Sequence, residues 1–106
     1  MNDEAEYFRH AEAAFKRIDL ALGDLEVDVV DCERSGDVIT ITFRGGKRCI
    51  VNTQRPTRQI WVAANARGWH FRIDGGTWVD EKDSSVELFA TLARIVRDHA
   101  GVDVTF

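Results

Sequence analysis

The sequence is poor in the residues that define cross-linked or metal-stapled small proteins. Its 106 residues include only one proline, one methionine and two cysteines. Cys32 and Cys49 lack CxxC spacing, and no histidine–cysteine cluster accompanies them, which argues against a zinc site or a disulfide framework. Because both fall in apolar-alternating segments, we expect reduced thiols that pack as small apolar side chains.

Long apolar runs are also missing. No stretch approaches the roughly 20 apolar residues that a transmembrane helix requires. The opening residues, MNDEAEYF, are acidic, unlike a secretory signal or an arginine-rich transit peptide. We therefore expect a cytoplasmic protein with no membrane partner, and its length and ordinary composition predict a single domain over residues 1–106.

Recognisable catalytic signatures are absent as well. The three histidines, His10, His70 and His99, are isolated in the sequence, and the serines lie at predicted turns or a helix start. There is no nucleophile elbow, phosphate-binding loop or metalloprotease motif. This favours a binding or regulatory protein over an enzyme.

Charge is distributed unevenly along the chain. Residues 1–33 contain ten acidic and three basic residues, whereas residues 34–73 contain eight basic residues and one acidic residue. An acidic segment of this kind repels phosphate backbones, so nucleic acid is not an expected partner. It favours cations or a basic protein surface instead.

Hydrophobic periodicity predicts a helix at each end with short strands between them. The first helix is expected over residues 4–22, and its apolar stripe comprises Phe8, Ala11, Phe15, Ile18 and Leu22. Five or six alternating segments separated by tight turns follow. Ser84 or Ser85 is expected to cap the final helix, with Glu87 near its first turn and Gly101 at its end.

These elements predict an α+β fold in the form of a two-layer sandwich. Tight turns make neighbouring strands antiparallel, so we expect an antiparallel five- to six-stranded sheet with the N- and C-terminal helices packed on one face. The other face stays open to water. By alternation, it carries Thr40, Thr42, Asn52, Gln59, Trp61 and His70.

One feature of interest is the row of acids around the end of the first helix. Glu12 and Asp19 are seven residues apart and share one flank of that helix, and Asp31 and Glu33 point outward from the next strand. Neighbouring carboxylates repel one another, and a multivalent cation such as iron, manganese, calcium or magnesium would relieve the repulsion. The alternative is a solvated acidic surface that protects an edge strand from aggregation.

A second feature is the stretch NTQRPTRQIWVA, residues 52–63. It places Trp61 among the amides of Asn52 and Gln59 on the open face. A large aromatic side chain among neutral hydrogen-bonding groups is typical of a protein-binding patch, because amides are less costly to desolvate than charges. The alternative is that neighbouring side chains half-bury Trp61.

The segments IVNTQRPTRQIWVA, GWHF and TWVD together resemble the frataxin family in its bacterial form. The preceding DCE and GDVITITF segments match as well, so the resemblance covers nearly the whole chain. The shared positions are Asn52, Gln54, Pro56, Gln59, Ile60, Trp61, Gly68, His70, Phe71 and Trp78. The family fold is the α–β sandwich predicted independently from the periodicity.

The resemblance implies weak binding of Fe²⁺ and Fe³⁺, and of other divalent cations, in iron–sulfur cluster assembly. It implies an iron donor or sensor that regulates the cysteine desulfurase, with the scaffold protein as a further partner, and a monomer without iron. The implied metal ligands are Asp3, Glu12, Asp19, Asp24, Glu26, Asp28, Asp31 and Glu33. The implied partner-binding residues are Asn52, Gln54, Gln59, Trp61 and His70.

The sequence departs from the family pattern in three places. Many bacterial relatives have an acidic pair where the first helix ends, but this chain has one acid there, Asp24. Tyr7 replaces an early histidine of some relatives, and Arg72 replaces a frequent acid. Two other functions stay open at this point: a metal-independent acidic module that docks on the desulfurase, and a weak ferroxidase.

Overall fold

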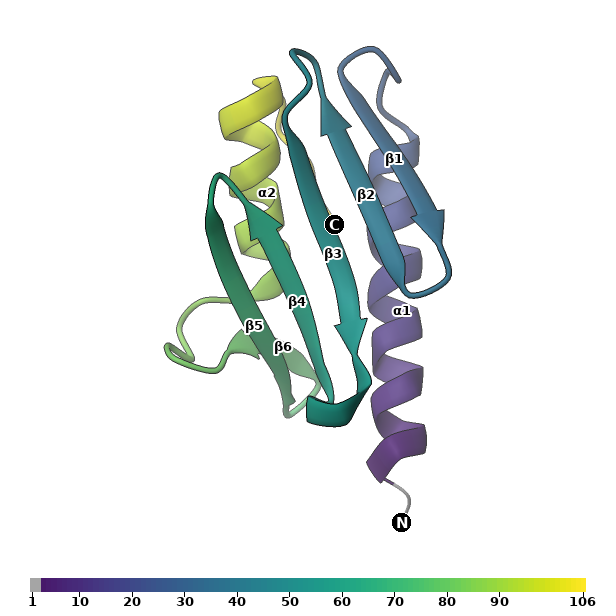
Figure 1. Cartoon of the computed structure of the whole chain (residues 1–106), viewed down its shortest axis with the longest axis vertical. Coiled ribbons are helices and arrows are strands. Elements are labelled where there is room, and N and C mark those ends of the chain that lie inside the picture. Colours follow the sequence, from purple (N-terminus) through teal and green to yellow (C-terminus); the bar gives the residue numbers. More distant parts are fainter. Residues whose placement is uncertain (1–2) are drawn as a thin grey trace.

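The computed structural model describes residues 3–106 as two helices and a six-stranded sheet (Figure 1). In chain order the elements are α1 (Asp3–Gly23), β1 (Val30–Ser35), β2 (Val38–Phe43), β3 (Arg48–Gln54), the short 3₁₀ helix η1 (Arg55–Thr57), β4 (Gln59–Ala64), β5 (Arg67–Asp74), β6 (Thr77–Asp80) and α2 (Leu88–Ala100). Among these described residues, no helix is long and apolar enough to cross a membrane.

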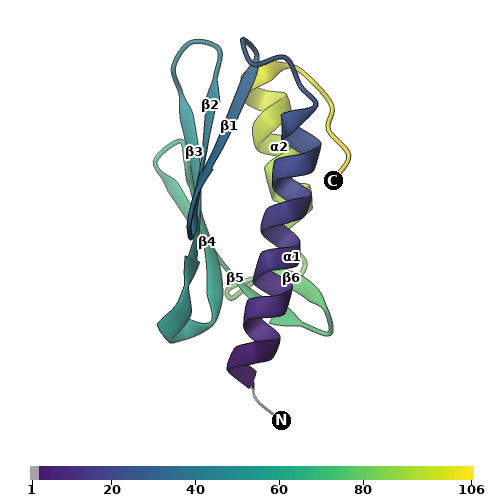
Figure 2. The same cartoon turned by 90° about the vertical axis from the view of Figure 1, so that its right-hand side faces the viewer.

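The strands follow one another across the sheet in sequence order, and every neighbouring pair is antiparallel. Both helices lie against the same face of the sheet, and no element of residues 3–106 covers the opposite face (Figure 2). The predicted two-layer α+β sandwich is therefore confirmed, with six strands.

The core lies between the helices and the covered face of the sheet. Strand β2 shows the alternation most clearly: Ile39, Ile41 and Phe43 are buried, while the threonines between them face the open side. Since the side-chain period of a strand is two, this alternation also fixes which residues are left on the open face.

The buried stripe of α1 differs from the expected one at its N-terminal end. Tyr7 is 2% exposed and Phe8 is 36% exposed, so the tyrosine and not the phenylalanine packs into the core. The Tyr7 ring meets Trp78 edge-on, and its hydroxyl donates a hydrogen bond to the backbone carbonyl of Gln59 at 2.8 Å. Tertiary contacts across the sheet thus select between two adjacent aromatic residues.

The cap of α2 was also predicted incorrectly. Glu87 is the N-cap residue, and its carboxylate accepts hydrogen bonds from the backbone N–H groups of Phe89 and Ala90. Ser85 lies in the preceding loop, where it bonds to Asp83. A carboxylate at this position satisfies two free N–H groups and also complements the helix dipole.

Candidate functional site

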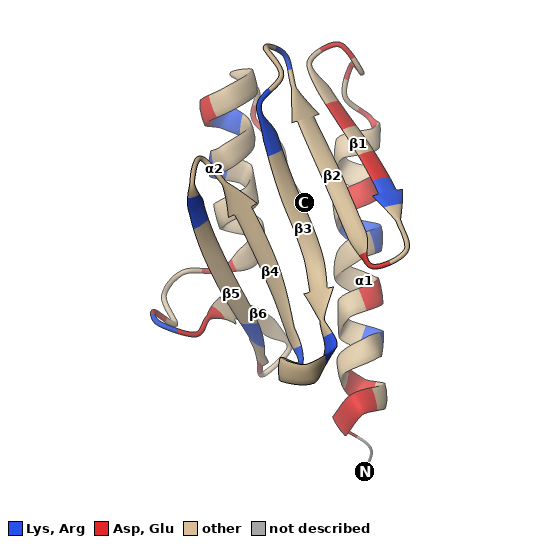
Figure 3. Cartoon of the chain, viewed as in Figure 1, with Lys and Arg blue, Asp and Glu red and all other residues tan. Residues whose placement is uncertain are grey.

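The acids of the N-terminal part lie along one edge of the molecule, on α1, on its connection to β1 and on β1 itself (Figure 3). We use the name acidic ridge for Asp19, Asp24, Glu26, Asp28, Asp31 and Glu33. Asp3 belongs to the first turn of α1, about 24 Å along the helix from Asp19 at 1.5 Å per residue. The structure therefore separates Asp3 from the acidic ridge.

The ridge acids flank strand β1 and do not converge on one point. Asp31 and Glu33 pair with Thr42 and Thr40, which places them on the open face of the sheet. Asp19 lies on the other side of the strand, with Oδ1 4.0 Å from the Cys32 sulfur. Within residues 3–106, no three histidine, cysteine or acidic side chains come close enough to hold one metal ion together. The ridge therefore offers dispersed carboxylates and no preformed chelating pocket.

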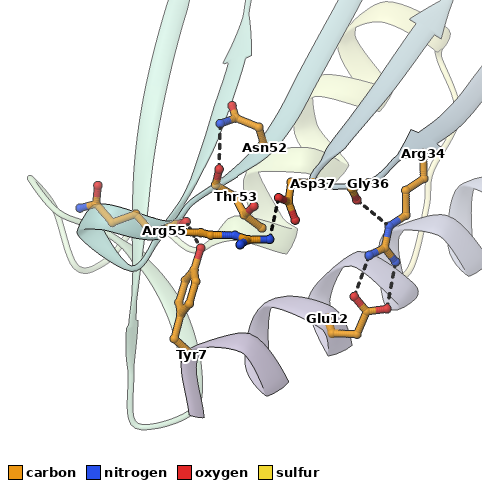
Figure 4. Close-up of polar contacts among 9 residues, drawn as sticks. Tyr7, Glu12, Arg34, Gly36, Asp37, Asn52, Thr53 and Arg55 are labelled. Atoms are coloured by element: carbon orange, nitrogen blue, oxygen red, sulfur yellow. Dashed lines mark hydrogen bonds and ion pairs between the residues drawn. The ribbon is translucent and has the colours of Figure 1, made fainter. Parts of the chain in front are cut away.

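Glu12 is already engaged by a basic side chain of the neighbouring strand. Arg34 of β1 donates to both carboxylate oxygens of Glu12, at 3.1 and 2.6 Å (Figure 4). This bidentate pair lowers the pKa of Glu12. A cation at Glu12 would have to compete with the Arg34 guanidinium.

The Glu12–Arg34 pair predicts a specific dependence of stability on pH. Because the folded pKa of Glu12 is lowered, the pair stabilises the fold above the ordinary glutamate pKa of about 4.3 and loses this effect as pH falls through the lower folded value. We expect the stability difference between the wild type and Glu12→Gln to be constant from pH 7 to about 5 and to shrink as the pH falls below the ordinary glutamate pKa of about 4.3. Urea unfolding of both proteins at a series of pH values measures it, and a difference that does not shrink in acid would contradict the assignment.

The half-buried thiol of Cys32 lies within the ridge but is a poor metal ligand. Burial, with the nearby negative charges of Asp19 and Asp31, raises its pKa to about 11. Burial likewise raises the pKa of Cys49 to about 12. Both cysteines are free thiols, as the sequence predicted. At neutral pH the ridge thus presents carboxylate oxygens, which suit iron, manganese, magnesium and calcium.

The second candidate surface lies in the middle of the open sheet face. Asn52, Trp61 and His70 are register partners on β3, β4 and β5, so the three side chains form a row across the strands. The His70 ring stacks on the Trp61 indole with a centroid distance of 4.0 Å and an interplanar angle of 9°. Gln54 is half-buried at the end of β3. We call Asn52, Gln54, Gln59, Trp61 and His70 the recognition face.

Gln59 connects Trp61 to Glu81 through the two ends of its side-chain amide. The residue is only 8% exposed, and both ends of its amide are bonded within the molecule. The amide oxygen accepts from Trp61 Nε1 at 2.8 Å, and the amide nitrogen donates to Glu81 Oε1 at 3.1 Å. Trp61 is consequently half-buried, as one interpretation of its sequence context expected, and it lies on the open face; its role in binding a protein stays a prediction.

Glu81, just after β6, is a residue of this surface that the sequence reasoning missed. Its second carboxylate oxygen lies 2.7 Å from His70 Nδ1. The hydrogen bonds from Gln59 and His70 lower the pKa of Glu81. No local motif marks Glu81, because its partners lie 22 and 11 residues away in the sequence.

The family assignment follows from sequence comparison. The sequence model of the frataxin-like domain matches residues 1–102 of this chain. The chain belongs to the frataxin-like family. Two bacterial frataxins named "Iron-sulfur cluster assembly protein CyaY", from Paraburkholderia xenovorans and Herminiimonas arsenicoxydans, are 43% identical over 103 residues and 40% identical over 106 residues. The first alignment covers 97% of this chain and 96% of the relative, and the second covers 95% and 93%.

Solved frataxin structures share the fold. The frataxin of Psychromonas ingrahamii superposes with a TM-score of 0.87 at 25% identity, over 98% of this chain and 96% of that protein. A trimeric frataxin from the yeast Saccharomyces cerevisiae, complexed with ferrous iron, gives a TM-score of 0.63 at 23% identity over 96% and 88% of the two chains. At that identity the yeast protein supports the fold alone.

Proposed function

We propose that this frataxin acts in iron–sulfur cluster assembly, where it binds iron weakly on the acidic ridge and regulates the cysteine desulfurase. The observation that carries the proposal is the pairing of two surfaces of different chemistry. The edge strand β1 carries a row of carboxylates (Figure 3), and strands β3 to β5 of the same sheet carry the uncharged row of Asn52, Trp61 and His70 on the same face. The names of the bacterial relatives support the role in cluster assembly.

The chemistry of the ridge fits iron as a transported ion. Its donors are carboxylate oxygens, and its thiol stays protonated at neutral pH. Because no three acidic, histidine or cysteine side chains of residues 3–106 converge, a bound ion would keep part of its water shell. Such an ion is held weakly and is easily passed to a partner. The same dispersion gives no support to a ferroxidase, which needs closely placed ligands for both substrate and oxidant.

The same carboxylates provide an electrostatic docking surface. A negative ridge attracts basic side chains and increases the rate of encounter with a basic partner. Asp31 and Glu33 face the same side of the sheet as Trp61, with three strand spacings, or about 14 Å, from β1 to β4. One partner assembly is therefore able to contact both surfaces. We assign the ridge to the cysteine desulfurase and the recognition face to the scaffold protein.

The test is an NMR titration of labelled, metal-free protein with Fe²⁺ under anaerobic conditions, with Mg²⁺ and Ca²⁺ as controls. We expect signals of residues 19–33 to broaden or shift while those of Gln59 and Trp61 stay unchanged. If the ridge does not respond, or if Mg²⁺ at equal concentration has the same effect, the acids are metal-independent docking charges for the desulfurase.

Charge reversal on the ridge tests the shared electrostatic role. We expect Asp31→Lys combined with Glu33→Lys to weaken both iron binding and desulfurase binding at least about tenfold, or 1.4 kcal/mol. Calorimetry for iron and a pull-down titration with purified desulfurase measure the two effects. The matched control is Asp98→Lys with Asp103→Lys, which changes the net charge equally at exposed positions of α2 and the C-terminal segment. Equal losses in both double variants would remove the ridge from the proposal.

A further inference from the structure

Three side chains of the recognition face, Gln59, Trp61 and His70, form a closed circuit of contacts with Glu81. Trp61 donates to Gln59, Gln59 donates to Glu81, Glu81 bonds to His70, and His70 stacks back on Trp61. The members come from β4, β5 and the loop after β6. Of these four residues, only Glu81 lies outside the sheet, and its carboxylate bonds to both Gln59 and His70.

We infer that Glu81 is a positioning residue of the recognition face, which sets the orientation of Trp61 and His70 for a protein partner. The inference rests on the proposed function, because it assumes that this face binds a partner. It adds a residue outside the expected partner-binding set, and its role does not require contact with the partner.

The hydrogen-bonding chemistry of Glu81 determines the orientation of Gln59. An ionised carboxylate only accepts hydrogen bonds, so the Gln59 amide must turn its nitrogen toward Glu81. The amide oxygen then faces Trp61 Nε1, which is only a donor. If Glu81 were absent, the nearly buried amide nitrogen of Gln59 would lack a partner, and the hydrogen bond from Trp61 Nε1 alone would hold the amide in its orientation.

Glu81 also determines the orientation of His70. Strand register places His70 opposite Trp61 but does not set the rotation of the imidazole ring. The contact of Nδ1 with the carboxylate at 2.7 Å sets that rotation, and the ring then lies parallel to the indole at 4.0 Å. In this arrangement Nδ1 carries the proton, which leaves the Nε2 lone pair unprotonated when the histidine is neutral.

The circuit defines what a partner would meet. The indole N–H of Trp61 is used within the molecule, and one ring face is covered by imidazole. The part of Trp61 that remains for a partner is therefore the apolar carbon surface of the indole, with the His70 imidazole as its polar neighbour. This chemistry fits a protein surface that places an apolar side chain against the indole. Holding both rings before binding reduces the entropy lost on association.

Two substitutions of Glu81 separate positioning from charge. Glu81→Ala removes both acceptors, whereas Glu81→Gln retains an oxygen for Gln59 and loses the charge, and its N–H group can donate to His70 Nδ1 once the neutral imidazole carries its proton on Nε2. We expect Glu81→Ala to shift the Trp61 indole N–H signal in NMR spectra of the isolated protein. It should also weaken binding to the purified desulfurase–scaffold complex about three- to tenfold. Glu81→Gln should stay within about twofold of the wild type, and thermal unfolding verifies that both variants fold.

The controls make each outcome decisive. Asp98→Ala removes an acidic charge from α2 and should leave both the indole signal and binding unchanged. Equal losses of binding in the two Glu81 variants would mean that its charge acts directly, and an unchanged indole signal or unchanged binding in Glu81→Ala would overturn the inference alone. A wild-type protein that does not bind the complex, or binding that is insensitive to Trp61→Ala, would instead overturn the proposed function of this face.

Discussion

Replacing Tyr7 with alanine should lower the free energy of unfolding by about 3–5 kcal/mol, the range for removing a buried aromatic side chain. Tyr7 is 2% exposed and packs edge-on against Trp78, with 6.1 Å between ring centroids. Its hydroxyl is also the hydrogen-bond partner of the Gln59 carbonyl at 2.8 Å. The substitution leaves a cavity and an unpaired acceptor, and urea unfolding measures the combined loss.

Two further substitutions divide this effect into parts. Tyr7→Phe retains the ring and removes only the hydroxyl, so it should cost about 1–2 kcal/mol. Phe8→Ala is the matched control, because Phe8 is the adjacent aromatic residue on the same helix and is 36% exposed. It should cost clearly less than Tyr7→Ala. A larger loss of stability for Phe8→Ala than for Tyr7→Ala would mean that Phe8 packs into the core, as hydrophobic periodicity alone predicts.

Tyr7 connects the stability of the fold to the recognition face. Its hydroxyl holds the backbone of Gln59, and the Gln59 side chain holds the indole of Trp61. Figure 4 shows the Tyr7 ring extending from α1 toward the turn between β3 and β4. Through Gln59, α1 is thus connected by hydrogen bonds to Trp61 of the recognition face.

Much of the fold was predictable because strands have a strict side-chain period. The alternation in VITITF and QIWVA assigned Ile39, Ile41, Ile60 and Val62 to the core, and all four are at most 1% exposed. The same alternation placed Trp61 on the open face, which the register with Asn52 and His70 confirms. A shift by one residue would exchange the two faces of a strand completely, so the alternation leaves little doubt about which side chains face the core.

Helix positions were less predictable because the helical period tolerates small shifts. Tyr7 and Phe8 are both apolar enough for the buried stripe, and either choice keeps Ala11, Phe15 and Ile18 on it. What selects Tyr7 is a carbonyl 52 residues away. Similarly, Ser84, Ser85 and Glu87 were all acceptable near the start of α2, and the path of the preceding loop made Glu87 the cap.

The acids and amides of the site were recognisable as residues, but their partners were not. In the sequence, Glu12 looked equivalent to the acids of the acidic ridge, but in the structure Arg34 is bonded to both of its oxygens. Gln59 looked like an exposed amide until Glu81 and Trp61 were found on its two ends. Polar contacts between distant segments have no periodic signature, so a single sequence does not reveal them.

Replacing Trp61 with alanine should weaken binding to the desulfurase–scaffold complex about 30- to 1,000-fold, equivalent to 2–4 kcal/mol. Tryptophans at the centre of an interface are frequent hot spots, and this one is held rigidly by a hydrogen bond and a stacked imidazole. Surface plasmon resonance with the immobilised complex measures the loss. Iron binding should stay unchanged, because the acidic ridge begins about 14 Å away across the sheet.

Trp69 is the matched control for this substitution. It belongs to β5, where it pairs with Val62 and faces the helices, so Trp69→Ala removes the same side chain from the opposite side of the sheet. We expect Trp69→Ala to reduce stability, because the side chain packs against the core, but to retain binding at a temperature where the variant is folded. Trp61→Ala should show the reverse pattern. If the two variants lost stability and binding in the same proportion, the loss would come from unfolding, and the open sheet face would have no separate role in recognition.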